Sequence, residues 1–292
     1  RFFDDIHDLD RARVLAEKAL SLNPHEELAL IALGELDLRA KDFSAIIERH
    51  SNSAISSTPN LRNRSKLLRI YADALDRTGR FDEAFEAYAA ANELQKTLSA
   101  EQVAHELSPL TSANLARLKR FFAAEDFSAW TRHDDLTGAS PVFLIGFIRS
   151  GTTWLDQILS SHPDIVVMEE EDNFYDSWRD LELSDEGLAR LRALSREDVL
   201  RYRDAYWRRA RPHLGDAAPG QLIVDKVPLN TIQMGLIHRL FPEARFIFDI
   251  RDPRDAVLSG FQQHFAINTA MSHFLDLESA AAFYDDVMTL GE

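Results

Sequence analysis

The stretch V-F-L-I-G-F-I-R-S-G-T-T-W, residues 142–154, decides the fold of the C-terminal half of the chain. Its apolar start, Val142–Ile145, is typical of a buried strand, and a helix pattern reaching about Ser161 follows the glycine-containing turn. Gly146 and Gly151 let the backbone turn tightly, so several N–H groups point into one concavity. Because a helix N-terminus also carries partial positive charge, this strand, loop and helix are predicted to bind an anion.

Two more apolar runs follow, each bounded by charged residues or proline: Leu222–Val224 and Phe246–Ile250. Short apolar strands that alternate with longer helical stretches predict a parallel sheet covered by helices on both faces. The turn-rich segment D-D-L-T-G-A-S-P, which ends at Pro141, marks the start of this α/β domain. We place the domain at residues 139–292.

The first 105 residues have a helical pattern almost throughout, and three of their segments resemble one another. The matching alanines of these segments are Ala12, Ala45 and Ala84, at intervals of 33 and 39 residues. A helix pair that repeats about every 34 residues is typical of tetratricopeptide repeats (TPR). We therefore predict TPR-like repeats over 1–105, with the extra length of the second interval in the polar segment 51–60, and a helical linker over 106–138. An irregular helical bundle is the alternative.

The composition is that of a globular protein of about two domains. Of the 292 residues, 45% are hydrophobic, and the net charge of −15 disfavours binding of nucleic acid. The chain has no cysteine and no apolar run near the ~20 residues that span a bilayer, so we expect a cytoplasmic protein without a membrane span. Because the first residue is Arg1 rather than Met, we expect the natural N-terminus to lie further upstream.

The position of its cation distinguishes the loop at 146–154 from a nucleotide triphosphatase P-loop. The two glycines have the spacing of that motif, but the lysine expected after the second glycine is Thr152, and a cation stands three residues earlier, at Arg149. The order Arg, Ser, Gly, Thr, Thr resembles the 5′-phosphosulfate loop of the sulfotransferase superfamily. The extension S-S-H-P, residues 160–163, makes the loop most similar to tyrosylprotein sulfotransferases and bacterial TPR sulfotransferases. Ile148 stands where those relatives usually have proline.

Two further segments resemble the same superfamily and occur in the same order. Residues 225–230, D-K-V-P-L-N, are similar to an internal family segment, and residues 245–261, R-F-I-F-D-I-R-D-P-R-D-A-V-L-S-G-F, are similar to its 3′-phosphate segment. The resemblance implies that Arg251 and Ser259 bind a 3′-phosphate, with the planar guanidinium suited to bidentate contact. The alternative is that the charged residues of R-D-P-R-D form only a surface network of ion pairs. Because family domains continue well beyond this segment, we expect the domain to be incomplete at its C-terminal end.

The resemblance also implies the ligands. The donor would be 3′-phosphoadenosine 5′-phosphosulfate (PAPS), the product adenosine 3′,5′-bisphosphate and the acceptor a hydroxyl group, with no metal. Ser150, Gly151, Thr152 and Thr153 would bind the 5′ end of the nucleotide. Trp154 is similar to the adenine-stacking tryptophan of cytosolic sulfotransferases, and plain packing in the core is its alternative role.

Transfer of the sulfuryl group places requirements on the rest of the site. Charge builds on the bridging oxygen as the S–O bond breaks, so fixed positive charge is needed there. The resemblance implies that Arg149 and Lys226 supply it. A general base must take the acceptor's proton, and the similar tyrosylprotein enzymes place a glutamate eight residues after the histidine of the S-S-H-P segment. That residue is Glu170, with Glu171 as the second candidate, while His162 is better explained as the end of a helix.

Two other functions remain open from the sequence. A P-loop kinase would use Asp225, at the end of L-I-V-D, to hold Mg²⁺. A helical-repeat scaffold that has lost catalysis is the third hypothesis. The sequence does not specify the acceptor, which is a protein tyrosine, a saccharide or a small molecule. The repeats are predicted to bind a polypeptide partner, to self-associate or to buttress the sheet.

Overall fold

The computed structural model describes residues 8–50, 55–130, 133, 140–215 and 220–292. Part of the predicted insertion at 51–60 and most of the predicted turn-rich boundary before Pro141 lie outside the described residues. The described residues form two compact units. The first unit comprises Arg1–Glu106 and Phe261–Asp276, and the second unit comprises Leu107–Gly260 and Leu277–Glu292.

The described residues of the first unit form helices and the loops between them, and no strand. Side chains at the starts of three of its helices accept hydrogen bonds from the first-turn N–H groups: Asp8, Asp42 and Asn60. The three-residue turn between the last two long helices contains Gly79 at φ 78°, and so short a connection makes these helices antiparallel neighbours. The helices are α2 (Leu9–Leu22), α3 (Glu27–Ala40), α4 (Phe43–Arg49), α6 (Leu61–Arg77) and α7 (Phe81–His105).

The predicted helical character of the N-terminal region is confirmed, while the repeat assignment stays a prediction. Ala12, Ala45 and Ala84 lie on α2, α4 and α7, which differ in length, with 14, 7 and 25 residues. Apolar side chains of α2 and α3 share one core cluster that includes Ala16 and Leu33. The helices therefore pack through small and aliphatic residues.

A segment from late in the chain completes the first unit. It contains α15 (Thr269–Ser272) and the short 3-10 helix η4 (His273–Leu275). The guanidinium of Arg69 donates to the carbonyl of Gln262 at 2.6 Å, and the amide of Asn92 donates to the carbonyl of Phe261 at 3.1 Å. The predicted C-terminal domain, 139–292, includes these residues, whereas in the structure they pack with α6 and α7.

The second unit is built on the predicted parallel sheet, which is confirmed. Its four strands are all parallel, in the order β2 (Ile165–Glu169), β3 (Leu222–Lys226), β1 (Val142–Gly146) and β4 (Arg245–Asp249). The strand β2 was not predicted, because its apolar run passes directly into the acidic residues 169–172. In this register the carboxyl ends of all four strands meet at one edge of the sheet.

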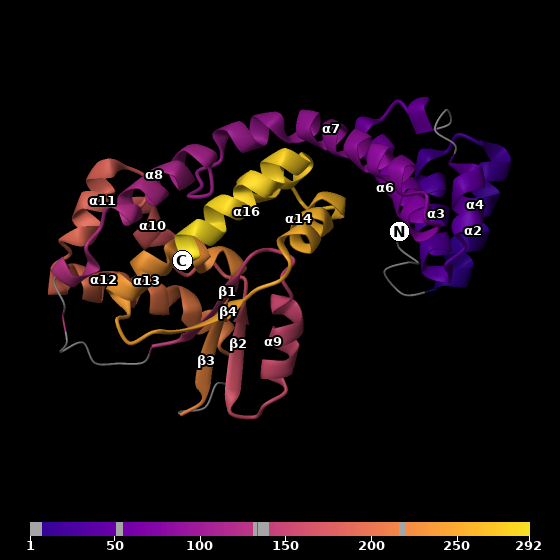
Figure 1. Ribbon diagram of the computed structural model, residues 1–292. Helices are drawn as coiled ribbons and strands as arrows, with labels where there is room; N and C mark the ends of the chain where they lie inside the picture. The colour runs from indigo at the N-terminus through magenta and orange to yellow at the C-terminus, as the bar shows by residue number, and fades with distance from the viewer. Residues whose placement is uncertain (1–7, 51–54, 131–132, 134–139, 216–219) are drawn as a thin grey trace. The chain divides into compact units, whose positions relative to one another are not determined.

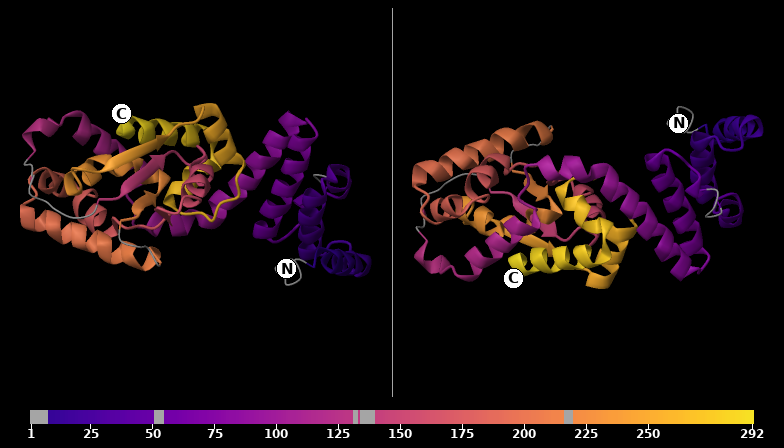
Figure 2. Two further views of the ribbon diagram at one scale, coloured as in Figure 1. Left: turned by 90° about the horizontal axis from the view of Figure 1, so that it is seen from below. Right: turned by 90° about the horizontal axis from the view of Figure 1, so that it is seen from above.

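Helices cover both faces of the sheet, as predicted (Figure 1). On one face, α9 (Thr152–Ser160) packs Leu155 and Leu159 over Leu144 and Val224. On the other face, Phe143 contacts an aromatic cluster from Phe174, Tyr206 and Phe241. Figure 2 shows the same sheet flanked by helices from two further sides.

The remaining elements of the second unit complete these two layers. The α-helices are α8 (Ser112–Ala123), α10 (Tyr175–Leu181), α11 (Asp185–Arg192), α12 (Arg196–Ala210), α13 (Met234–Leu240), α14 (Pro253–Gln262) and α16 (Leu277–Gly291). The 3-10 helices are η1 (Phe127–Ala129), η2 (Arg211–His213) and η3 (Pro228–Gln233). Among the described residues, no helix is both long enough and apolar enough to cross a membrane.

Candidate functional site

The loop between β1 and α9 is shaped by two glycines that no other residue can replace without strain. Gly146 has φ 154°, and a Cβ there would lie 2.5 Å from the carbonyl oxygen of Asp249. Gly151 has φ 129°, in the region that favours glycine. Arg149 itself has φ 71°, which is unusual for a residue with a side chain.

The hydroxyl of Thr231 fixes the start of this loop. It accepts a hydrogen bond from the N–H of Gly146 at 3.0 Å. It also lies 2.8 Å from the carbonyl oxygens of Gly146 and Pro228, one of which takes its proton. Sequence analysis did not single out Thr231, although it directly follows the D-K-V-P-L-N segment. The loop therefore has a rigid base.

The structure brings Arg149, Arg251 and Ser259 together, although they are far apart in the sequence. The Nε of Arg149 donates to the hydroxyl of Ser259 at 3.1 Å, and an Nη of Arg251 donates to the backbone oxygen of Arg149 at 3.1 Å. Both guanidinium groups are exposed at the carboxyl edge of the sheet. They form a cationic patch beside the N-terminus of α9, as an anion-binding site requires.

Part of the alternative ion-pair network is also present. Arg254 contacts Asp252 at 2.8 Å on the surface, and this partner lowers the pKa of Asp252 to about 2. Arg251 lies 3.7 Å from Asp255 one turn further along. The two arginines of R-D-P-R-D therefore have different contacts, because only Arg251 also donates a hydrogen bond to the loop between β1 and α9.

The hydroxyl groups of the loop have different surroundings. Ser150 donates to the carboxylate of Asp249 at 3.1 Å, Thr152 is buried and Thr153 is exposed. The backbone N–H groups of Thr152 and Thr153 open α9 and have no acceptor within the helix. The side chain of Trp154 is 79% exposed, so core packing, one of its two predicted roles, is wrong.

A second cluster lies where β2 and β3 end. The Nζ of Lys226 contacts a carboxylate oxygen of Glu170 at 2.9 Å. The side chain of Lys226 is only 3% exposed, whereas that of Glu170 is 61% exposed. The backbone of Glu170 has φ 51°, and its N–H donates to the carbonyl of Lys226 at 2.8 Å. This turn aims the glutamate at the lysine.

A buried carboxylate that sequence analysis missed lies behind Lys226. Asp156 of α9 is fully buried, 3.7 Å from the Nζ of Lys226, and accepts a hydrogen bond from Ser160 at 3.1 Å. Its second oxygen has no hydrogen-bond partner among the described residues. The hydrogen bond to Asp156 and the repulsion between the two carboxylates raise the pKa of Glu169. The signal in the sequence was an acidic residue beside Leu155 on the apolar face of α9.

The other candidates for a general base have different partners. Glu171 lies 3.1 Å from a ring nitrogen of His213. The ring of His162 accepts a hydrogen bond from the N–H of Asp164 at 3.1 Å, just after α9 ends. Of the three candidates, only Glu170 has a contact with Lys226 among those described.

Asp225 lies on the opposite face of the sheet from α9, since successive side chains of a strand alternate. It is fully buried, and it accepts hydrogen bonds from the hydroxyl of Tyr206 at 2.7 Å and the amide of Asn173 at 3.1 Å. Burial raises the pKa of Asp225 to about 6 and, with the nearby charge of Asp225, raises that of Tyr206 as well. This placement turns Asp225 away from the loop and counts against the role of a magnesium ligand for a phosphate held there.

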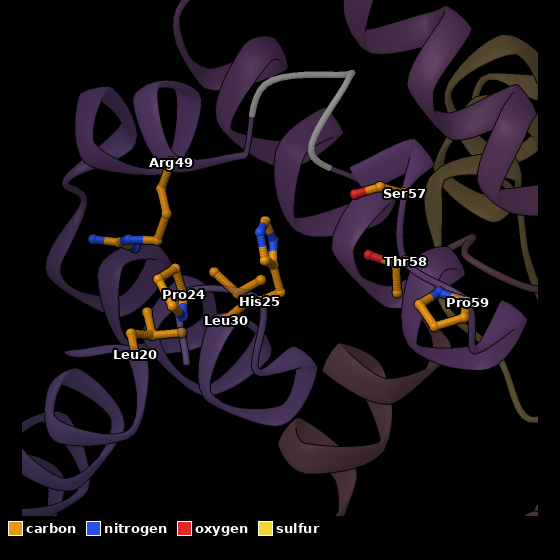
Figure 3. Close-up of a pocket in the computed structure, with 8 residues that line it drawn as sticks. All are labelled: Leu20, Pro24, His25, Leu30, Arg49, Ser57, Thr58 and Pro59. Carbon is orange, nitrogen blue, oxygen red and sulfur yellow. The ribbon is translucent and has the colours of Figure 1, made fainter. Parts of the chain in front are cut away.

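A separate cavity of about 470 Å³ lies within the first unit (Figure 3). Its walls combine apolar side chains such as Leu20, Pro24 and Leu30 with Arg49. The guanidinium of Arg49 is already paired with Asp37 at 2.5 Å. In the described part of the chain, no cluster of three or more His, Asp or Glu side chains is arranged to hold a metal ion.

Comparison with known proteins identifies the family of the region that contains this site. A family model described as "Sulfotransferase family" matches residues 141–291, which contain all the candidate site residues. A similar protein, an "Uncharacterized protein" of Aquifex aeolicus (strain VF5), is 26% identical over 281 residues, which cover 89% of this chain and 34% of the relative. The chain thus spans about a third of that relative's length. No solved structure matches the chain.

These comparisons confirm the predicted superfamily. The nearer likeness to tyrosylprotein sulfotransferases and to TPR sulfotransferases stays a prediction. Since the family model covers just over half of the chain, including the loop and the strands that position the cations, the chain belongs to the sulfotransferase family.

Proposed function

We propose that the chain transfers the sulfuryl group of PAPS to an acceptor hydroxyl, without a metal ion. One observation carries the proposal beyond family membership. The two hydrogen bonds among Arg149, Arg251 and Ser259 join the loop proposed for the 5′ end of the nucleotide to the segment proposed for its 3′-phosphate. A nucleotide with phosphates at both ends of its ribose suits two linked cationic sites.

Each part of the donor has a proposed partner. The free N–H groups at the start of α9, with Thr152 and Thr153, would hold the 5′-phosphate. Arg251 and Ser259 would hold the 3′-phosphate by charge-assisted and neutral hydrogen bonds. The exposed ring of Trp154 is available to stack on adenine.

The proposed chemistry is an in-line transfer. The acceptor oxygen attacks sulfur and passes its proton to the carboxylate of Glu170, while the bond from sulfur to the bridging oxygen breaks. The bridging oxygen leaves on the 5′-phosphate with the electron pair, and Lys226 and Arg149 stabilise that charge. Lys226 contacts Glu170 directly, so the proposed base and one of the proposed cations lie next to each other at the carboxyl edge of the sheet.

The acceptor and the partners are proposed only as classes. A protein tyrosine, a saccharide and a small-molecule alcohol all present a hydroxyl to one base. The N-terminal helices are proposed to bind a polypeptide, to self-associate or to support the sheet, and the protein is proposed to be cytoplasmic. Because the chain spans about a third of its relative, the activity of the whole protein belongs to the same proposal.

Calorimetry separates this function from a kinase. Adenosine 3′,5′-bisphosphate without metal is expected to bind more tightly than ATP with Mg²⁺. A transfer assay with ³⁵S-labelled PAPS over tyrosine peptides, saccharides and small alcohols then identifies the acceptor class. Preference for ATP with Mg²⁺ would contradict the proposal.

A further inference from the structure

A carboxylate lies against the loop that is proposed to bind the 5′-phosphate. Asp249 is the last residue of β4 and pairs in register with Gly146. One of its carboxylate oxygens accepts the hydrogen bond of Ser150 at 3.1 Å, and the same oxygen lies 3.3 Å from where a Cβ of Gly151 would stand. A carboxylate is thus built into the loop that is proposed to bind an anion, and neither family membership nor the proposed chemistry accounts for it.

The effect of this carboxylate depends on where the nucleotide carries its charge. At its 5′ end, PAPS bears one negative charge on the phosphate and one on the sulfuryl group, which lies further from the ribose. When the S–O bond breaks, the bridging oxygen keeps the electron pair, and the 5′-phosphate of the product carries nearly two negative charges. Repulsion between like charges grows as the distance falls, so Asp249 opposes the product more than the donor.

We infer that Asp249 is a specificity-determining residue, which favours PAPS over adenosine 3′,5′-bisphosphate and so promotes product release. The inference rests on the proposed function. The cations Arg149 and Arg251 attract both nucleotides, and without an opposing charge they would favour the product, whose charge is concentrated on the phosphate. Asp249 reduces that preference.

The competing explanation is that Asp249 and Ser150 hold a divalent cation, as a carboxylate and a hydroxyl do in P-loop phosphotransferases. The two explanations predict opposite results. Removing a repulsive carboxylate tightens binding of the product, whereas removing a metal ligand weakens it and abolishes any dependence on Mg²⁺.

The test is calorimetry of Asp249→Asn with each nucleotide, in the absence of acceptor and with and without Mg²⁺. We expect adenosine 3′,5′-bisphosphate to bind about tenfold more tightly than to the wild-type protein and PAPS about threefold more tightly, both without Mg²⁺. Asp164→Asn is the matched control, because Asp164 precedes β2 at the opposite edge of the sheet. It should leave both affinities unchanged.

A second variant protects the test against misfolding. Asp249→Ser also removes the charge and should change the ratio of the two affinities in the same direction. An unchanged ratio in both folded variants, or Mg²⁺-dependent binding lost with Asp249, would overturn this inference alone. Failure of both nucleotides to bind the wild-type protein would overturn the proposed function, and this inference with it.

Discussion

Replacement of Glu182 by glutamine is expected to make the protein more stable at neutral pH. Glu182 follows α10 and is fully buried, with its N–H donating to the carbonyl of Trp178 at 2.8 Å. Among the described residues, neither of its carboxylate oxygens has a hydrogen-bond partner. Burial alone raises the pKa of this carboxyl from 4.5 to about 8.

The size of the effect follows from proton linkage. The unfolded chain releases this proton above about pH 4.5, whereas the folded chain keeps it to about pH 8. The contribution of Glu182 to the free energy of unfolding is therefore fully present below about pH 4.5, and it is lost as the pH rises towards about 8. The free energy of unfolding therefore falls by about 1.4 kcal/mol per pH unit in this interval, or about 3 kcal/mol between about pH 5 and about pH 7.5.

The assay is urea denaturation of the wild-type protein and Glu182→Gln at several pH values between those limits. The free energy of unfolding of the variant, minus that of the wild type, should rise by about 3 kcal/mol between about pH 5 and about pH 7.5, because glutamine cannot ionise. The unpaired amide adds an offset that does not depend on pH. Glu182→Leu should show the same dependence on pH with a different offset, and a difference that stays constant with pH would refute the reasoning.

Three further predictions concern the site and its support. Arg251→Ala should weaken binding of adenosine 3′,5′-bisphosphate about tenfold or more in calorimetry, whereas Arg254→Ala should change it little, because only Arg251 reaches the loop. Glu170→Gln should lower turnover at least about a hundredfold in the ³⁵S-transfer assay with nearly unchanged nucleotide affinity, and a turnover like that of the wild type would exclude this residue as the base. Tyr206→Phe should lower the free energy of unfolding by about 1–3 kcal/mol in urea, because Asp225 loses a buried donor at 2.7 Å; equal stability would show that the bond contributes nothing.

Much of the second unit could be predicted because its signals are local. A strand of apolar residues, two glycines and a helix start fall within residues 142–154, and their geometry depends little on the rest of the chain. The likeness of residues 245–261 to a 3′-phosphate segment indicated that Arg251 and Ser259 belong to one site. Their hydrogen bonds with Arg149 required the parallel pairing of β1 with β4, which the alternation of strands and helices predicted in outline.

Other features could not be predicted because they depend on contacts between distant residues. Nothing near Phe261 shows that its carbonyl will accept a hydrogen bond from Asn92 in another part of the chain. Asp156 and Asp249 each interrupt an apolar pattern, and a single polar residue does not show what it will face after folding. The strand β2 was not predicted because its short apolar run passes directly into the acidic residues 169–172.

The return of Phe261–Asp276 to the first unit has a consequence for dissecting the protein. The backbone crosses between the units three times, after Glu106, Gly260 and Asp276, so no single cut of the gene releases either one whole. A truncated polypeptide ending at Glu106 would lose the acceptors of the guanidinium of Arg69 and of the amide of Asn92, at about 1 kcal/mol for each hydrogen bond. To express the first unit alone, Phe261–Asp276 should be joined to Glu106 by a short linker.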